Sequence, residues 1–219
     1  MFYESKNKTR KSSMSYRKVV KMIKEEIAPG IVVYSNVIPD SETLCADIEE
    51  GLVSANIQWI PAEVKQDKES EVDTNSRDTS TFGVPYFGGI SEDFSNFQSS
   101  FNSTLNNLFF ENFDVVERDY KNNFGATAPW HDSYAVLKYG VGQKFTNHID
   151  DHQDYHRRIS TTYYINDNYL GGEIVFPRFD VTFKPKANQM IIFPSTYVYN
   201  HSVLPVIEGE RYAVVSWMR

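Results

Sequence analysis

From about residue 133 to the C-terminus, apolar and polar side chains alternate with a period of two. Eight short runs show this pattern: SYAVLKY, KFTNHID, ISTTYYI, GEIVF, VTFKP, QMIIF, HSVLPVI and RYAVVSWM. Turn-forming segments such as YGVGQK, NDNYLGG, KPKAN and EGE separate them. Such alternation is typical of β-strands, whose successive side chains point to opposite faces. Eight strands without an intervening helix favour a closed or double-sheet β architecture, such as a jelly roll, over residues 133–219.

Helical patterns replace this alternation in the first half of the chain. Residues 40–56 begin with the capping candidates Asp40 and Ser41 and continue with apolar residues at helical spacing. Residues 91–110 follow a candidate cap at Ser91, and their apolar stripe consists of Phe94, Phe97, Phe101, Leu105 and Leu108. Further strands are expected within residues 28–39 and 57–64. We expect the helices to pack on one outer face of the β core, giving an α+β fold that is mainly β.

Two segments are too polar to form core elements. Residues 1–26 hold eight Lys/Arg and three Asp/Glu, a net +5 that leaves −12 on the rest of the chain. We expect a basic, partly disordered arm there. Residues 65–80, KQDKESEVDTNSRDTS, are predicted to be a flexible loop. The remaining length of residues 27–219 suits a single domain.

The composition also limits the partners. An acidic body argues against nucleic acid as the main partner, because phosphate contacts need a basic face. No run approaches the roughly 20 apolar residues of a membrane span, and the N-terminal stretch has no apolar core of a secretory signal. The lone Cys45 fits a reducing compartment. We therefore expect a soluble, cytoplasmic protein that does not bind membranes.

A candidate metal site lies in the segment FTNHIDDHQDYH. On a strand, His148 and Asp150 share a face while Ile149 points the other way, so the imidazole and the carboxylate can converge on one ion. His201 is the candidate third ligand, on a later strand that a jelly roll can place alongside. Two histidines and one carboxylate on one face of an octahedron are typical of non-haem Fe(II) oxygenases. A zincin site with His148 and His152 on a helix is the weaker alternative, because it requires a glutamate at position 149.

The last strand-like run adds a cation. Arg211 shares a strand face with small and apolar residues in RYAVVSWM, where a charge is costly unless it meets an anion. A guanidinium binds a carboxylate through two parallel hydrogen bonds. Two partners fit Arg211: an acidic side chain of the protein, in a structural ion pair, or the carboxylate of a ligand. Because Arg211 lies ten residues after the candidate metal ligand His201, the ligand carboxylate is favoured.

These motifs together resemble the prolyl 4-hydroxylase-like family of Fe(II)- and 2-oxoglutarate-dependent dioxygenases. LKYGVGQKFTNHID resembles the family's Tyr-Gly turn followed by His-x-Asp, and YYINDNYLGGEIVFP resembles its Tyr-Leu-Asn strand and Gly-Gly-Glu. FKPKANQMIIFP and HSVLPVIEGERYAVVSW resemble the Lys-Pro hairpin and the distal segment with histidine, basic residue and tryptophan. The resemblance covers residues 133–219 well. Upstream, SRDTSTF resembles a short segment beside the family's mobile substrate loop.

The resemblance implies a double-stranded β-helix (jelly-roll or cupin-like) core. It implies His148, Asp150 and His201 as iron ligands and Arg211 as the partner of the 2-oxoglutarate C5 carboxylate. The other residues that would bind the keto acid are Tyr139, Tyr164, Ser160 and Thr162, and those that would approach the substrate are Arg77, Arg158 and Trp217. The implied cofactors are Fe(II), 2-oxoglutarate and O₂, with ascorbate as a candidate reductant.

The activity predicted on this basis is hydroxylation of a prolyl residue in a peptide or protein to 4-hydroxyproline, with loop 65–80 closing over the peptide. Arg211 stands where collagen-type members have lysine, Phe145 where some members have a substrate-contacting tyrosine, and Asn188 where glycine is frequent. These departures leave the iron and cosubstrate sites intact but leave the substrate open. Hydroxylation of another side chain or a small molecule, nucleic-acid demethylation, and a non-catalytic β-helix binding protein are the alternatives.

Overall fold

The computed structural model describes residues 21–66, 69–86, 100–152, 154 and 156–219. Its larger sheet has the strand order β1 (Ile23–Ala28), β2 (Ile31–Ser35), β13 (Gln189–Pro194), β9 (Ile159–Tyr164), β16 (Arg211–Met218), β7 (Tyr134–Tyr139), β6 (Ser80–Val84) and β3 (Ile60–Pro61). Its smaller sheet has the order β12 (Val181–Phe183), β11 (Ile174–Phe176), β14 (His201–Val203) and β8 (Phe145–His148). Two strand pairs complete the β structure, β10 (Leu170–Gly171) with β15 (Val206–Glu208) and β4 (Val64–Gln66) with β5 (Glu69–Glu71).

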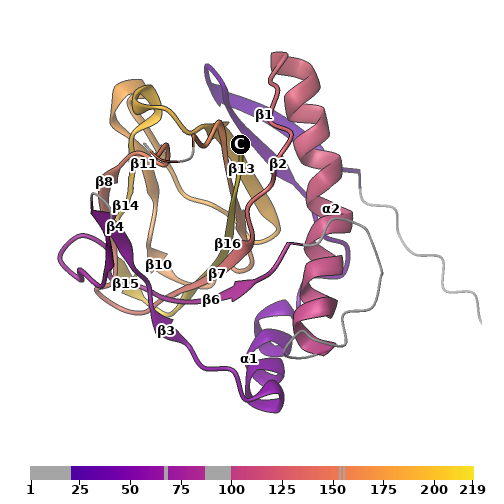
Figure 1. Ribbon diagram of the computed structural model, residues 1–219, viewed down its shortest axis with the longest axis vertical. Helices are drawn as coiled ribbons and strands as arrows, with labels where there is room; N and C mark the ends of the chain where they lie inside the picture. The colour runs from indigo at the N-terminus through magenta and orange to yellow at the C-terminus, as the bar shows by residue number, and fades with distance from the viewer. Residues whose placement is uncertain (1–20, 67–68, 87–99, 153, 155) are drawn as a thin grey trace, which may run out of the picture.

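The architecture has three layers. In Figure 1 the smaller sheet lies on the left and the larger sheet in the middle, helix α2 (Ser100–Phe124) runs along the right, and helix α1 (Leu44–Ala55) lies at the bottom beside the lower end of α2. The helices thus pack on one outer face of the β core, as the sequence predicts. The two facing sheets with interleaved strand order form a double-stranded β-helix, which confirms the predicted fold class.

Each of the eight alternating runs contains a strand, with two differences in extent. HSVLPVI divides into β14 and β15, because Pro205 between them has no N–H to give to a ladder. The run KFTNHID ends as a strand at His148, so Asp150 lies in the segment that follows β8. The sequence pattern therefore identifies the strands correctly but not where each of them stops.

The larger sheet is buried on both faces. Along β9, Ile159 and Tyr163 pack with the helices, whereas Tyr164 belongs to the separate cluster between the two sheets. Along β16, Tyr212 and Val214 face the helices, and Ala213 faces the smaller sheet. Alternation thus delivers one set of side chains to the helical layer and another to the inside of the β-helix.

The helices agree with the prediction in position but not at their ends. In α1 the buried residues Leu44, Ile48 and Leu52 recur at helical spacing, and Thr43 rather than Asp40 or Ser41 is the N-cap residue, without a capping side-chain bond. The second helix continues to Phe124, well beyond the predicted residue 110. The predicted cap Ser91, with Phe94 and Phe97, lies outside the described residues. The rest of the predicted apolar stripe is in contact with the core: Phe101, Leu105 and Leu108.

The N-terminal boundary differs from the sequence-based one. Residues 23–26 were assigned to the basic arm, but they form most of β1, which pairs antiparallel with β2. The side chain of Lys24 also forms an ion pair with Asp119 of α2, at 2.9 Å. The folded domain therefore begins before residue 27. Residues 1–20 lie outside the described part of the chain.

The polar segment 65–80 is not a structureless loop. It contains part of the β4–β5 pair and then a turn around residues 73–76 before β6. The two strands pair through backbone hydrogen bonds, which a polar sequence can form as well as an apolar one.

Asn188 explains one departure from the family pattern. It adopts a left-handed conformation with φ of 62°, which glycine or asparagine tolerates best. Its side chain exchanges two hydrogen bonds of 2.8 Å with the backbone of Ile38. Asparagine therefore suits the turn as glycine would, and it also ties the turn to the segment that follows β2.

Across the described ranges, no helix has both the length and the apolar character needed to cross a membrane.

The contact between α2 and the larger sheet predicts a large stability effect. Phe113 is 1% exposed, and its ring lies 5.2 Å from that of Tyr163 and 5.8 Å from that of Tyr134. We expect Phe113→Ala to lower the free energy of unfolding by about 3–5 kcal/mol, since it leaves a cavity between helix and sheet. Val115→Ala is the control on the same helix, because Val115 is 49% exposed and its loss should cost less than about 1 kcal/mol. Urea denaturation measures both, and equal costs would contradict this account of the packing.

Candidate active site

Strand pairing in the smaller sheet brings two distant histidines together. β8 and β14 run antiparallel with His148 directly opposite His201, and their ring centroids are 4.3 Å apart. Asp150 reaches both, with its Oδ1 3.5 Å from Nε2 of His148 and its Oδ2 3.8 Å from Nε2 of His201. One potential ligand atom from each of the three residues lies within 4.8 Å of the other two. The predicted grouping of these side chains is therefore present.

Backbone carbonyls fix the orientation of both imidazoles. Nδ1 of His148 is 2.8 Å from the carbonyl oxygen of Thr146, and Nδ1 of His201 is 3.1 Å from that of Tyr199. A carbonyl only accepts, so each Nδ1 carries the proton and donates it. Each Nε2 is then left with a free lone pair directed at the cluster, as metal ligation by histidine requires.

The electrostatics of the cluster favour an unprotonated His201 and an ionised Asp150. Burial lowers the pKa of His201 to about 4, and the neighbouring His148 acts in the same direction. Burial by itself would raise the pKa of Asp150, but His201 and His148 hold it well below its usual range. A hydrogen bond with Ser160 adds to this effect, and Ser160 in turn bonds the hydroxyl of Ser195 at 2.8 Å. At neutral pH the site therefore offers a neutral His201 imidazole and the Asp150 carboxylate.

A buried cation lies at the other end of the same interior. Arg211 opens β16 opposite Tyr139 of β7 and is 1% exposed. Its Cζ atom lies 4.8 Å from the ring centroid of Tyr139 and 5.1 Å from that of Tyr164. Its Nε and Nη1 atoms are buried without a hydrogen-bond partner in the described part of the chain. Burying a guanidinium whose Nε and Nη1 make no hydrogen bond costs free energy. The geometry is therefore that of a binding site for an anion.

Tyr169 belongs to this site, although the sequence analysis did not single it out. The hydroxyls of Tyr164 and Tyr169 are both buried without a partner among the described residues, and both tyrosines interact with Arg211. Burial raises the pKa of each hydroxyl, so both remain protonated and able to donate. Lys184 contacts Tyr169 twice: its Nζ lies 4.0 Å from the centroid of the Tyr169 ring and donates a hydrogen bond to the Tyr169 carbonyl. In the sequence Tyr169 is one tyrosine of the turn segment NDNYLGG, and nothing local indicates a binding role. Only the fold brings it next to Arg211 of β16.

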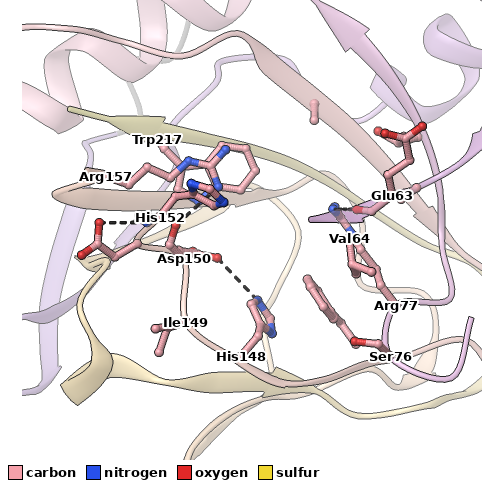
Figure 2. A pocket seen from close by; sticks show the side chains of 15 residues that line it. Glu63, Val64, Ser76, Arg77, His148, Ile149, Asp150, His152, Arg157 and Trp217 are labelled. Carbon is pink, nitrogen blue, oxygen red and sulfur yellow. Dashed lines mark hydrogen bonds and ion pairs between the residues drawn. The ribbon is translucent and has the colours of Figure 1, made fainter. Parts of the chain in front are cut away.

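Two connected depressions contain these groups. A small inner chamber of about 40 Å³ is lined by the three cluster residues, Arg211 and Thr162, among others. An outer cleft of about 460 Å³ opens above it, and the residues that line both are Arg77, Phe145, His148, Asp150 and Trp217. Figure 2 shows the outer cleft, with Arg157 and Trp217 on one side and Arg77 and Glu63 on the other. The cluster therefore lies between an enclosed cationic chamber and an open cleft.

Five further predicted site residues divide into four that line a depression and Ser160, which does not. Tyr139 and Thr162 line the inner chamber, and Trp217 and Arg77 line both depressions. Ser160, predicted to line the keto-acid pocket, instead bonds Asp150 and Ser195.

Arg158, predicted to approach the substrate, lies away from both depressions. Its Nη1 bonds the carbonyl of Thr127 at 2.8 Å, and it lines none of the described depressions. The preceding residue, Arg157, lies over the Trp217 ring at 3.6 Å and lines the outer cleft instead. Alternation at a strand start turns neighbouring side chains in opposite directions, and the sequence did not reveal which arginine faces inward.

The fold and this site together define a class. A double-stranded β-helix carrying two histidines and a carboxylate beside a buried arginine is the arrangement of non-haem iron oxygenases. Residues 134–219 match the family model described as "2OG-Fe(II) oxygenase superfamily".

Individual relatives resemble parts of the chain. A PKHD-type hydroxylase of Prochlorococcus marinus (strain MIT 9215) is 40% identical over 83 residues, which make up 35% of this chain and 37% of that protein. Human prolyl 3-hydroxylase 2 is 38% identical over 66 residues, 28% of this chain and 9% of that protein. The chain thus matches little more than a third of the length of the first relative and less than a tenth of the length of the second.

Solved structures show a similar fold over most of the chain. A Pseudomonas putida prolyl-4-hydroxylase superposes with a TM-score of 0.64 at 19% identity, covering 87% of this chain and 92% of that one. A prolyl hydroxylase from Trichoplax adhaerens, in complex with a hypoxia inducible factor peptide fragment, superposes with a TM-score of 0.63 at 16% identity, covering 86% and 83%. At these identities the similarity establishes the fold.

The close approach of Gly172 to Arg211 predicts a specific sensitivity. Gly172 has φ of +66°, and a Cβ there would lie 2.9 Å from Cδ of Arg211 and 3.1 Å from the Tyr169 ring. We expect Gly172→Ala to destabilise the fold by more than the 1–2 kcal/mol that backbone strain alone costs, because the buried arginine has to move.

Gly142→Ala is the matched control. Gly142 has φ of +83° with nothing within 4 Å of its Cβ position, so it reports the strain without the clash. Urea denaturation of both variants gives the difference, and equal losses of stability would mean that Gly172 makes no special room for Arg211.

Proposed function

We propose that this protein is an Fe(II)- and 2-oxoglutarate-dependent dioxygenase that hydroxylates a prolyl residue in a peptide or protein. The products would be 4-hydroxyproline, succinate and CO₂. The observation that carries the proposal is the buried Arg211, which lies in the same small chamber as His148, Asp150 and His201 and whose Nε and Nη1 have no hydrogen-bond partner among the described residues. Three metal-ligating side chains alone fit many roles. The same side chains beside an anion site fit a chelating acid that carries a second carboxylate.

The residues present fit a ferrous ion. His148 and His201 would each bind it through Nε2, since Nδ1 is engaged with a backbone carbonyl, and Asp150 would bind through its carboxylate. Two nitrogens and one oxygen from the protein leave coordination positions open for a chelating cosubstrate and for O₂. When bound, iron supplies the activation of O₂ that decarboxylation of the keto acid drives. The protein orients the ligand atoms through the backbone carbonyls that accept from both imidazoles.

The opposite end of the chamber fits the far carboxylate of 2-oxoglutarate. Arg211 would meet it with the guanidinium, and Tyr164 and Tyr169 would donate their hydroxyl protons to it. Thr162 of β9, on the same inner face as Tyr164, lines the chamber between the two ends. One carboxylate could accept hydrogen bonds from four buried groups that have no partner among the described residues: Nε and Nη1 of Arg211 and the hydroxyls of Tyr164 and Tyr169.

The outer cleft supports a chain-like substrate. It is open, and it combines apolar and charged side chains, among them Ile149, Trp217, Arg77, Arg157 and Glu63. An open cleft above the reacting centre admits an extended peptide, whereas a small molecule would be expected to be enclosed more completely. The names of the similar proteins favour proline as the target residue, because prolyl hydroxylases occur among both the sequence relatives and the similar structures.

The three cluster residues predict the first test of this function. His148→Ala, Asp150→Ala or His201→Ala should each reduce succinate formation by more than 100-fold, because a two-ligand site does not retain the metal. His156→Ala is the control: His156 follows closely in sequence, but it is largely exposed and lines none of the described cavities. Anaerobic titration with Fe(II) and a succinate assay measure both properties, and a fully active His201→Ala variant would refute the assignment.

The anion site predicts the second test. Arg211→Ala should raise the dissociation constant of 2-oxoglutarate about 100-fold, as expected for loss of a charge-assisted bidentate pair. Tyr164→Phe and Tyr169→Phe should each raise it about 3- to 30-fold, because each removes one donor and keeps the ring. Tyr163→Phe, whose hydroxyl lies on the other face of β9 near Asn188, should leave it unchanged. Calorimetry under anaerobic conditions measures all four, and an unchanged constant in Arg211→Ala would refute the anion site.

The identity of the substrate is tested by its product. The loaded protein should convert proline-containing peptides to products heavier by one oxygen atom, and amino-acid analysis then distinguishes 4-hydroxyproline from 3-hydroxyproline. An oxygen atom on a residue other than proline would favour a different side chain as the target. Binding of 2-oxoglutarate without succinate release from any peptide or small molecule would favour a β-helix binding protein.

A further inference from the structure

We infer that residues 76–78, with Phe145, position His148, so that the wall of the substrate cleft controls how well the cluster binds its metal. This inference rests on the proposed function, because it assigns a role in metal binding. The segment is part of the polar stretch before β6, far in sequence from the three ligand residues. The relevant contacts form two separate routes from this segment to one imidazole.

The first route runs through the backbone. The smaller sheet ends at β8, and residues 76–78 add to that edge: Asp78 N–H donates to the Lys144 carbonyl at 2.9 Å and Thr146 N–H donates to the Ser76 carbonyl at 2.8 Å. The carbonyl of Thr146 is the group that accepts from Nδ1 of His148. The residue whose carbonyl orients the ligand histidine is therefore anchored to the cleft segment through its own N–H.

The second route is a stack of side chains. Cζ of Arg77 lies 4.9 Å from the Phe145 ring centroid. The Phe145 ring lies parallel to the His148 imidazole, with centroids 3.6 Å apart and planes inclined by 14°. A planar cation over a ring that itself covers an imidazole restricts rotation of the imidazole about its side-chain torsions. Phe145 thus limits the directions in which Nε2 of His148 can point.

The other histidine has no such dependence on the cleft. His201 is enclosed by the interior rings of Phe176 and Phe193, with centroids at 5.5 and 4.8 Å. Its side chain is 7% exposed, against 18% for that of His148. The core therefore fixes His201, whereas His148 takes its position from an edge strand and the segment added to it. Of the two imidazoles, His148 is the one that a change in the cleft can move.

Arg77 connects this stack to the substrate side. Its Nη1 donates to the carbonyl of Glu63 on the same side of the cleft at 3.0 Å, and it lines both the outer cleft and the inner chamber. A peptide that contacts Arg77 or displaces its bond to Glu63 acts on the stack over His148. By linkage, any such effect of peptide on metal affinity equals the effect of metal on peptide affinity. The consequence is a metal centre that becomes fully ordered when the cleft is filled.

Metal affinity tests the inference without turnover. Co(II) serves as an air-stable probe in the full-length protein, and its visible absorption and competition with a chelator give a dissociation constant. We expect Phe145→Leu and Arg77→Gln to raise this constant about tenfold each. Phe145→Tyr, which keeps the stacked ring, should restore the wild-type value.

Matched controls separate positioning from general damage. Phe124→Leu changes an exposed ring on α2, and Arg158→Gln changes the arginine that lies outside the cleft; neither should alter Co(II) binding. The melting temperature of each metal-free variant should stay near that of the wild type. Because Arg77 acts through Phe145, the double variant Phe145→Leu/Arg77→Gln should bind Co(II) no more weakly than Phe145→Leu alone.

Three results have distinct meanings. A Co(II) constant within twofold of wild type in both single variants overturns the inference and leaves the proposed function standing. Additive losses in the double variant overturn the stack as the route from Arg77. A wild-type protein that binds no Co(II) through His148, Asp150 and His201 overturns the proposed function and the inference with it.

Discussion

The antiparallel pairing of β8 with β14 is the interaction on which the site depends. It places His148 directly opposite His201 although 52 positions of sequence separate them. Asp150 then needs only two further residues to reach both rings. Since a change of register by one residue sends side chains to the opposite face, the cluster exists only in this register. The contacts around β8 and β14 are therefore as important for the metal centre as the ligands themselves.

A second constraint is the buried charge of Arg211. The protein places a guanidinium in its interior with no partner for Nε and Nη1 in the described residues, at a free-energy cost that the rest of the fold has to offset. The extensive packing of α1 and α2 on the outer face of the larger sheet supplies stability for that purpose. The inner face of the same sheet can then carry polar groups for binding. Burial on both faces divides the sheet into a structural side and a binding side.

The two parts of the chain contribute differently to the site. The family model matches residues 134–219, and this part contributes the three cluster residues, Arg211 and most of the lining of the inner chamber. The part before residue 134 supplies the helices, the β4–β5 ribbon and Arg77 in the cleft wall. The residues that would bind iron and keto acid thus lie in the part that the family model matches, and the upstream part completes the wall of the cleft.

The sequence by itself determined the eight β runs, the two helical regions, the grouping of His148 with Asp150 and the anomaly of Arg211, because each depends on local periodicity or on the cost of burying a charge. It did not determine where strands stop, which of Arg157 and Arg158 faces the cleft, that residues 23–26 join the sheet, or that Tyr169 meets Arg211. Those features depend on strand register and on contacts between segments far apart in the chain. Only the tertiary structure decided them, since no local pattern records which distant strand lies alongside.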